Sequence, residues 1–408
     1  MKKLLSLICF FAGLCLNLNL QALAGIPMVV NLDASHDGFY QAMTWGVGSD
    51  GFRRTGDAKG VFYTISDRGP NIDCQNSEKV FGREICQEGK IFPMPSFNPS
   101  ILKWNWSESG GLNLIKIIPL KNRDGRAISG LSNPWKQAKT ESGIDLEGNE
   151  LAFDAEGVDP EGLVVLTDGS FWVSEEYGPS LMHVSAEGEI LERWVPEGLE
   201  NDLRAAHYTV LGKLPAILKE RKLNRGIESL TLSPDGSHLI AAMQSALENP
   251  DSSTAKSSRV VRFLTVDLKS SQVDGLYAYE MDKPEYFDIK GLKKVKTGDL
   301  KISSIVYFGN RLLVQERTDD TMKIFEFHPG ENLLNCQVAN ETKSPTLEES
   351  TVNSQSKTLI WDAETIGADA PSKIEGMIAW DEKTLLLVND NDFGLTGIRS
   401  EGYFLRLP

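Results

Sequence analysis

The chain has 408 residues, of which 24% are charged and 41% belong to the hydrophobic set. This balance excludes a wholly disordered chain, a collagen and a protein with several membrane spans. The formal net charge of −15 at pH 7 excludes the basic footprint that nucleic-acid binding requires.

The N-terminal residues 1–24 have the pattern of a cleavable signal segment. Two lysines precede an apolar run over residues 4–16, and Ala22-Leu23-Ala24 forms a small-residue cleavage site. The run is too short to span a bilayer comfortably, and no later segment has about 18 unbroken apolar residues. We therefore expect an exported protein, periplasmic or extracellular, without stable membrane insertion, in which residues 25–408 form a single domain.

The expected export bears on whether the cysteines form disulfides. Cys74 and Cys86 lie twelve residues apart in a polar stretch, so a local disulfide is expected in an oxidising compartment. Cys336 is then expected to be a free or buried thiol. A lipid anchor at Cys15 is the alternative to simple cleavage, although Leu14 is a poor residue before such a site.

A strand-rich unit begins at Asp159-Pro160-Glu161-Gly162-Leu163. Two apolar runs flank Asp168-Gly169, which is a strong hairpin-turn pair, and the second run ends in the acidic loop Ser174-Glu175-Glu176-Tyr177-Gly178-Pro179. Two more short apolar runs follow around a second turn at Glu187-Gly188. The pattern predicts strand, turn, strand, acidic loop, strand, turn, strand.

This unit recurs along the chain. Glu228 opens a copy 67 residues after Glu161, and Glu375 opens another 214 residues after it. The segments 61–70 and 305–317 keep the strand pattern without the leading Glu. Recurring four-stranded units are typical of a β-propeller.

Five units are visible, and the stretches 101–155 and 259–279 have room for more strands. We therefore predict an all-β propeller of six or seven blades. A two-domain β-sandwich is the alternative, but it would not explain the aligned acidic loops. The C-terminal strand, 403–407, is a candidate to close the ring with residues 27–33.

Several stretches are predicted to be insertions. Residues 71–98 and 120–155 are expected to form long loops, and 339–357 a polar loop. One short helix is expected within 205–221, where leucine and isoleucine recur at helical spacing.

Superposing the units brings four carboxylates to one position at the end of the second strand: Asp67, Glu176, Glu316 and Asp390. The copy that starts at Glu228 has Met243 there. Equivalent positions of a propeller lie around one axis, and like charges brought together cost free energy unless they are neutralised. A Ca²⁺ ion, with its six to eight oxygen ligands, would neutralise them.

The unit starts supply a second ring of acids, Glu161, Glu228 and Glu375, one of which could act as a general base. Three arginines lie close to the two rings in sequence, and their planar guanidinium groups suit phosphate or carboxylate. These candidate substrate-binding residues are Arg68, Arg225 and Arg317. The alternative is that the arginines are only structural partners of the acids.

These motifs resemble the phytase-like family, also described by the esterase-like activity of phytase. The resemblance rests on the unit at 159–179, on Asn224-Arg225-Gly226-Ile227-Glu228, and on Ile374-Glu375-Gly376 with Asn389-Asp390-Asn391-Asp392. It extends from about residue 30 to residue 400. It implies hydrolysis of ester or phosphoester bonds, without indicating which residues are catalytic.

The leading hypothesis is a metal-dependent esterase or phosphoesterase that acts on a small molecule as a monomer. A lactonase-like propeller is a second reading, with neutral substrates and no need for the arginines. A non-catalytic propeller that binds a protein or glycan, with a purely structural ion, is the third.

Overall fold

The structure is a computed structural model that describes residues 28–31, 46–288, 294–336, 356–369, 373–395 and 397–407. The predicted signal segment and most of the polar stretch 339–357 lie outside the described residues. Within the described part of the chain, no helix is long and apolar enough to cross a membrane.

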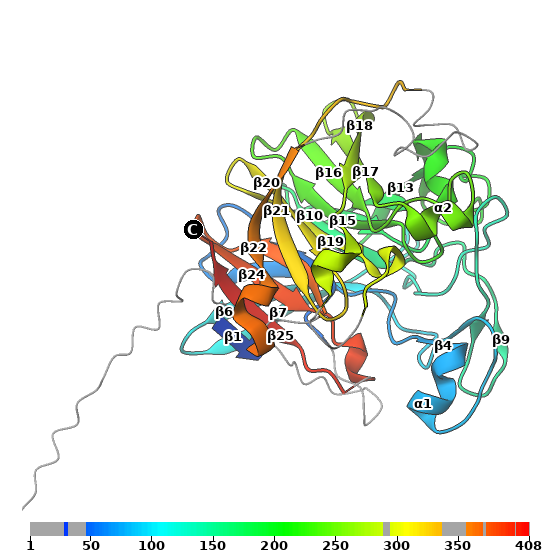
Figure 1. Cartoon of the computed structure of the whole chain (residues 1–408). Coiled ribbons are helices and arrows are strands. Elements are labelled where there is room, and N and C mark those ends of the chain that lie inside the picture. Colours follow the sequence, from blue (N-terminus) through cyan, green and yellow to red (C-terminus); the bar gives the residue numbers. More distant parts are fainter. Residues whose placement is uncertain are drawn as a thin grey trace, which may run out of the picture.

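Five sheets make up the body of the molecule (Figure 1). In order of pairing, the first sheet contains β2 (Asp50–Phe52), β3 (Val61–Ile65), β6 (Ser100–Ser107) and β7 (Gly111–Pro119). The second contains β10 (Pro160–Val165), β11 (Phe171–Glu175), β12 (Ser180–Val184), β13 (Ile190–Pro196) and β14 (Thr209–Leu214).

The other three sheets are built in the same way. The third contains β15 (Ile227–Leu232), β16 (His238–Met243), β17 (Val260–Asp267) and β18 (Gln272–Glu280). The fourth contains β19 (Lys301–Phe308), β20 (Arg311–Arg317), β21 (Met322–His328) and β22 (Ser356–Asp362). The fifth contains β23 (Ile374–Ala379), β24 (Thr384–Asn389), β25 (Glu401–Arg406) and β1 (Met28–Asn31).

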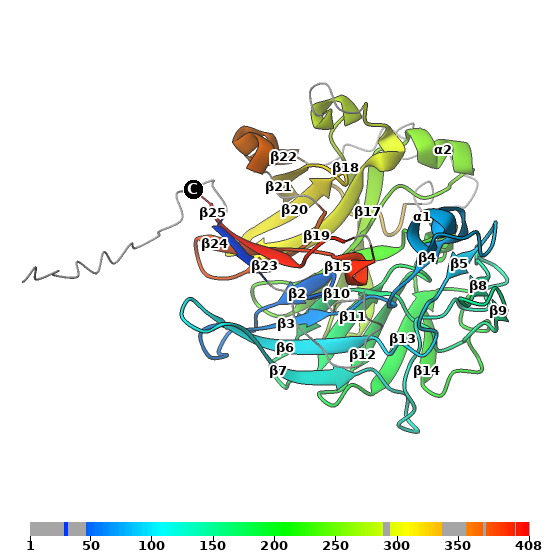
Figure 2. The same ribbon diagram turned by 90° about the horizontal axis from the view of Figure 1, so that it is seen from below.

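The innermost strands of these sheets contact one another in a closed ring, in the order β2, β10, β15, β19, β23 and back to β2. Figure 2 shows the five strands around the centre, with the later strands of each sheet farther out. The described residues therefore form a propeller of five blades, not the six or seven that we predicted. The stretches expected to form further blades are instead outer strands, β6 and β7 in the first blade and β17 and β18 in the third.

The ring is closed by the two ends of the described chain. β1 pairs with β25 in antiparallel register, with Met28 opposite Phe404 and Asn31 opposite Glu401. This confirms the predicted pairing of the C-terminal strand with the N-terminal segment.

The predicted insertion at 71–98 is more ordered than a loop. It contains β4 (Ile72–Asp73), the 3-10 helix η1 (Cys74–Asn76), α1 (Ser77–Phe81) and β5 (Lys90–Ile91). β5 also pairs with β8 (Gly143–Ile144), which pairs with β9 (Glu150–Leu151) from the second predicted insertion. Together they form a small four-stranded sheet, and Figure 1 shows α1 and β4 near β9 at the edge of the propeller.

The helix predicted within 205–221 is confirmed in part, as a short 3-10 helix near the end of this range. The segment forms β14, which pairs in parallel with β13, and then the 3-10 helix η2 (Ala216–Glu220). Pro215 separates the two, and a residue before proline is disfavoured in the helical region, so Leu214 ends a strand. The described α-helices are α1 and α2 (Ser252–Ser257), and the remaining 3-10 helices are η3 (Pro284–Phe287), η4 (Thr297–Asp299), η5 (Ala363–Asp369) and η6 (Asp392–Gly394).

Apolar side chains fill the space between neighbouring blades. One buried cluster runs through the second, third and fourth blades and includes Trp194, Phe263 and Val314. Another joins the first and second blades and includes Ile65 and Val173. Since each blade buries its faces against its neighbours, the apolar strand patterns in the sequence are explained by the ring.

A polar network lies among the inner strands. The carboxylate of Asp50, which is 2% exposed, accepts hydrogen bonds from the hydroxyls of Ser229 at 2.8 Å and Ser304 at 3.2 Å. Each hydroxyl also accepts a backbone N–H from the next blade, Ile305 at 3.0 Å and Met377 at 2.9 Å respectively. The network therefore connects the first, third, fourth and fifth blades.

Replacing Ser304 tests this network. Ser304→Ala removes a donor to Asp50 and the acceptor of the Met377 N–H, so two buried polar groups lose a partner. We expect the free energy of unfolding to fall by about 1–3 kcal/mol in urea titrations. Ser142→Ala, which removes an exposed hydroxyl bonded to Glu150, is the control. Equal stability of the two variants would contradict a contribution of the Asp50 network to the free energy of unfolding.

Candidate active site

A polar cavity of about 390 Å³ opens at one end of the propeller axis. We call it the axial cavity. Its acidic lining residues are Asp67, Asp73, Glu141, Asp159, Glu161, Glu176, Glu228, Glu375, Asp390 and Asp392. Its basic and amide lining residues are Lys90, Arg225, Lys301, Asn71, Asn224 and Gln244. The structure thus brings together seven of the ten predicted site residues, from four of the five blades.

The strand ends explain why these carboxylates converge. Each inner strand from β10 onwards has an irregularity of register near its start, and these irregularities include Glu161, Glu228, Ser303 and Glu375. A β-bulge re-aims the extra side chain, which is one reason bulges occur next to active sites. Three of the four blades use the bulge to direct a glutamate into the cavity.

Three carboxylates form a tight group on the second blade. Asp159, Glu161 and Glu176 each offer an oxygen, and the three oxygens lie within 4.8 Å of one another. All three side chains are buried. Burial first, and neighbouring carboxylates second, raise the pKa of Glu161 and Glu176 well above their usual range. Asp159 has its pKa raised to about 6 by burial, against the opposing effect of Arg68.

A second acidic group lies between the first and fifth blades. Burial raises the pKa of Asp67, with a further contribution from Asp159, and it raises the pKa of Asp390, with further contributions from Asp392 and Glu375. Each group would carry unfavourable like charge if fully ionised, so the cavity has a strong electrostatic demand for cations.

The amide of Gln244 connects two of the glutamates. Its Nε2 donates to Glu176 at 2.9 Å and to Glu228 at 2.6 Å. Asn224 donates to the other oxygen of Glu176 at 2.9 Å, from a left-handed backbone conformation with φ of 55°. Non-glycine residues in this conformation cluster at functional sites. Both amides fix the orientation of Glu176.

Three cationic side chains, Lys90, Arg225 and Lys301, line the axial cavity. Arg225 lines it and donates to the carbonyl of Leu300 at 3.4 Å. Lys301 lies in the same lining, and the nearby guanidinium of Arg317, followed by burial, lowers the pKa of its ammonium group. Lys90 enters from β5 and pairs with Asp73 at 3.0 Å. Anionic groups of a ligand would therefore meet Arg225 and Lys301.

Two predicted substrate-binding arginines are not among the residues that line the cavity. Arg68 is enclosed between the rings of Tyr177 and Phe92, at 4.5 and 4.8 Å, and its Nε donates to Gly130 at 2.9 Å. Arg317 forms an ion pair with Glu375 and is 1% exposed. In this structure the donors of both arginines are used within the protein.

Glu316 lies outside the axial cavity because the predicted alignment is off by one residue. Glu316 pairs with Ile302 across the hairpin, as Glu175 pairs with Pro160. The position that Glu176 and Asp390 hold, directly after the paired residue, belongs to Arg317 in this blade. Since side chains alternate along a strand, a shift of one residue points Glu316 to the other face.

On that face Glu316 has structural partners. It accepts hydrogen bonds from the hydroxyl of Tyr279 at 2.6 Å and the N–H of Asp282 at 2.7 Å, and it pairs with Lys357. The same correction applies in the third blade, where Met243 pairs with Ile227 and the next residue, Gln244, reaches the cavity. Asp159 was also missed, although it begins the Asp-Pro-Glu-Gly motif.

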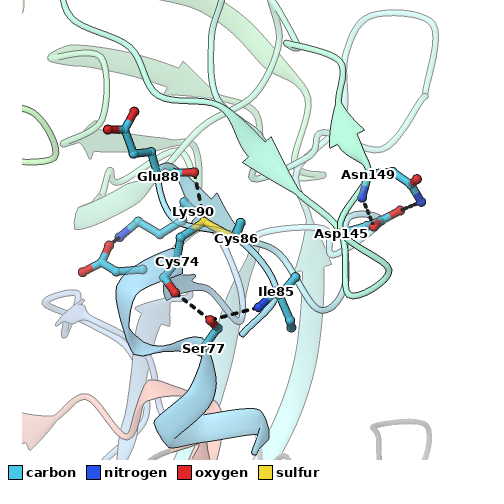
Figure 3. The surroundings of a disulfide bond; sticks show 9 residues. Cys74, Ser77, Ile85, Cys86, Glu88, Lys90, Asp145 and Asn149 are labelled. Atoms are coloured by element: carbon cyan, nitrogen blue, oxygen red, sulfur yellow. Dashed lines mark hydrogen bonds and ion pairs between the residues drawn. A yellow bond between two sulfur atoms is a disulfide. The ribbon is translucent and has the colours of Figure 1, made fainter. Parts of the chain in front are cut away.

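The small sheet beside the propeller forms part of the cavity wall. Asp73 and Lys90 come from the strands that flank the disulfide between Cys74 and Cys86, and Asn71 directly precedes β4. This disulfide confirms the pairing predicted from sequence. Figure 3 shows Ser77 beside it, with a hydroxyl that donates to the Cys74 carbonyl at 2.7 Å and accepts the Ile85 N–H at 3.2 Å.

A family model described as "Esterase-like activity of phytase" matches residues 50–393. The chain belongs to the phytase-like family. The match contains all ten predicted site residues and the five inner strands of this phytase-like propeller.

Relatives of this phytase-like chain give little further detail. An uncharacterized secreted protein of Arthroderma benhamiae is 25% identical over 273 residues, which are 60% of this chain and 50% of that protein. The chain thus spans about half the length of the curated relative it matches.

One solved structure that resembles the chain is an aldose sugar dehydrogenase from Streptomyces coelicolor, which is 8% identical in sequence. The comparison covers 94% of this chain and 99% of that chain, with a TM-score of 0.33. A protein of unknown function from Dyadobacter fermentans is 7% identical, with coverages of 93% and 98% and a TM-score of 0.37.

The pKa of Glu228 predicts how the stability of the metal-free protein depends on pH. Burial, and then Glu375, raise it from 4.5 to about 7 in the folded state. The folded protein therefore binds more protons than the unfolded chain between these values, and stability falls as the pH rises through about 7. We expect urea titrations in EDTA to show this decrease between about pH 5 and pH 8. Glu228→Gln should reduce the decrease, and stability that rises over this range would contradict the assignment.

Proposed function

We propose that the chain is an exported, divalent-cation-dependent esterase or phosphoesterase that acts on a small anionic substrate. The observation that carries the proposal is the meeting of buried carboxylates with Arg225 and Lys301 in one open cavity. Membership of the phytase-like family supports the reaction class. The secreted relative and the signal pattern of residues 1–24 support export.

The donor atoms of the axial cavity fit a hard cation. The described lining residues offer carboxylate and amide oxygens, and no histidine or cysteine is among them. Oxygen-rich sites of this kind suit Ca²⁺, Mg²⁺ or Mn²⁺ better than softer metals. We assign Asp159, Glu161 and Glu176 as the main ligands of a Ca²⁺ ion. Asp67 and Asp390, from the first and fifth blades, would contribute directly or through water.

This assignment changes the role first predicted for two glutamates. Glu161 was a candidate base, but its position within the group of three makes it a ligand. Glu375 forms an ion pair with the buried Arg317, so we assign it as the partner of this cation and not as the base. Of the three glutamates first predicted as candidate bases, Glu228 remains, and we propose it as the general base.

The reaction then follows from what each side chain can do. A bound divalent cation would polarise the scissile ester or phosphoester group. Arg225 and Lys301 hold the anionic part of the substrate and orient it toward the acidic wall. Glu228 accepts a proton from the attacking water, and Gln244 keeps its carboxylate in place through the bond at 2.6 Å.

A hydrolysis panel tests the function. The protein is assayed on small phosphoesters, carboxylic esters and lactones, first in EDTA and then with Ca²⁺ restored. We expect EDTA to abolish turnover of a phosphoester and Ca²⁺ to restore it. Turnover of lactones or neutral esters alone would favour the lactonase-like reading. No turnover, with Ca²⁺ still raising the melting temperature, would indicate a binding module with a structural ion.

Glu176 and Glu316 form a matched pair for the metal assignment. Glu176→Gln removes a charge from the group of three, and we expect Ca²⁺ affinity to fall by about 100-fold or more in calorimetric titrations, because indirect partners alone cost about 10–100-fold. Glu316→Gln changes another buried acid, which lies outside the cavity, and should leave the affinity unchanged. Both variants are first checked for native circular dichroism. Equal losses would contradict the proposed ligand set.

Arg225 tests the substrate class. Arg225→Met should raise KM for a phosphomonoester by about tenfold, because an ionic partner that is largely removed from water is lost. KM for a neutral ester should change little. A loss of the same size for both substrates would contradict a specific role in binding the anion.

A further inference from the structure

A second cavity lies at the other end of the propeller axis. It has a volume of about 880 Å³, which is within the usual range for small-molecule sites. We call it the hairpin cavity, because the turns between the first and second strands of all five blades line it. These segments are 51–56, 165–167, 231–236, 306–311 and 379–382.

The hairpin cavity is separate from the axial cavity. Gly51 lines it, and the next residue toward the axial cavity is Asp50, which is 2% exposed and bonded to Ser229 and Ser304. The two cavities share no lining residue. The two ends also differ in chemistry, since more than half of the hairpin cavity's surface is apolar, whereas the axial cavity is almost wholly polar.

A rigid aromatic wall supplies part of this apolar surface. Trp380 is 9% exposed and packs edge-to-face against Phe62 and Phe404, with ring centroids 5.8 and 5.0 Å apart. Phe52 and Tyr307 also line the cavity. A ligand with a flat apolar body would bury its surface here at little cost in side-chain ordering.

Arg53 supplies an unpaired charge beside this wall. Its guanidinium lies 5.5 Å from the centre of the Trp380 ring, and Nη1 donates to the Trp380 carbonyl at 2.7 Å. The Nε atom is buried and has no hydrogen-bond partner. Among the described residues, no carboxylate lies within 4.0 Å of this guanidinium, whereas Arg54 and Arg311 pair with Asp57 at 2.7 Å and Glu326 at 3.9 Å.

The acids of the hairpin cavity do not satisfy Arg53. They are Asp235, Asp381 and Glu382, and all three lie on exposed turns where water solvates them. Asp235 already accepts the hydroxyls of Ser233 at 2.6 Å and Ser237 at 2.8 Å. A half-buried cation without a partner is costly, whereas a solvated carboxylate is not. The charged group of the cavity that lacks a counter-ion is therefore Arg53, and its counter-ion would be an anion.

We propose that the hairpin cavity binds a small organic anion with a flat apolar body, of the class of aromatic carboxylates. The carboxylate would pair with the guanidinium group of Arg53, and the aromatic body would lie along Trp380 and Tyr307. This site is independent of the proposed hydrolytic reaction, because it shares no lining residue with the axial cavity.

Calorimetric titration with 2-naphthoate tests the proposal on the full-length exported protein. We expect one saturable site, and binding at least about tenfold weaker for the neutral analogue 2-naphthylmethanol, because a charge-assisted hydrogen bond is lost. Arg53→Met should weaken 2-naphthoate binding by a similar factor. Arg126→Met, which changes an exposed arginine paired with Asp124, should leave it unchanged.

Two further variants locate the site even if Arg53→Met fails to fold. Thr167→Trp places a large side chain in the cavity from an exposed turn and should abolish binding. Glu176→Gln, in the axial cavity, should leave it intact. The proposal is overturned by the absence of saturable binding, by full binding in Thr167→Trp or in a folded Arg53→Met variant, or by its loss in Glu176→Gln.

Discussion

Repulsion between buried carboxylates is the constraint on which the rest of this structure depends. Glu161, Glu176, Asp67 and Asp390 are spread over more than 300 residues of the chain, yet they share one cavity, and each has its pKa raised. Such an arrangement costs free energy that the remaining contacts must offset. The amides of Asn224 and Gln244 and the cations Arg225 and Lys301 offset part of it locally, and a bound cation would offset more.

The five-bladed ring provides the rigidity that this arrangement requires. Bulges near the starts of the inner strands aim glutamates toward the axis, and the paired strands behind them cannot relax outward without breaking inter-blade packing. The Asp50 network ties four blades together just below the acids. Charge at the cavity and packing between blades are therefore coupled, since movement of one blade would alter the spacing of every carboxylate pair.

Local repetition in the sequence predicted much of this arrangement. The unit around Glu161 was enough to place Glu228 and Glu375 at equivalent positions, because identical turn and strand patterns fold alike. The pattern could not fix strand register, which depends on pairing across the hairpin, and so Glu316 was placed on the wrong face. Nor could it reveal that aromatic rings enclose Arg68, because Phe92 and Tyr177 meet only through tertiary folding. The prediction of six or seven blades was wrong for a similar reason, since the sequence alone does not distinguish an outer strand of one blade from the first strand of another.

Pairing of β1 with β25 has a consequence for how the molecule is made. The fifth blade needs segments from both ends of the described chain, so the ring cannot close while the chain is still emerging from the ribosome. Contacts of such long sequence separation form late and slowly. A nascent chain of this design keeps an incomplete fifth blade until β25 is released from the ribosome. The topology thus delays closure of the ring until both partner strands of the fifth blade have been synthesised.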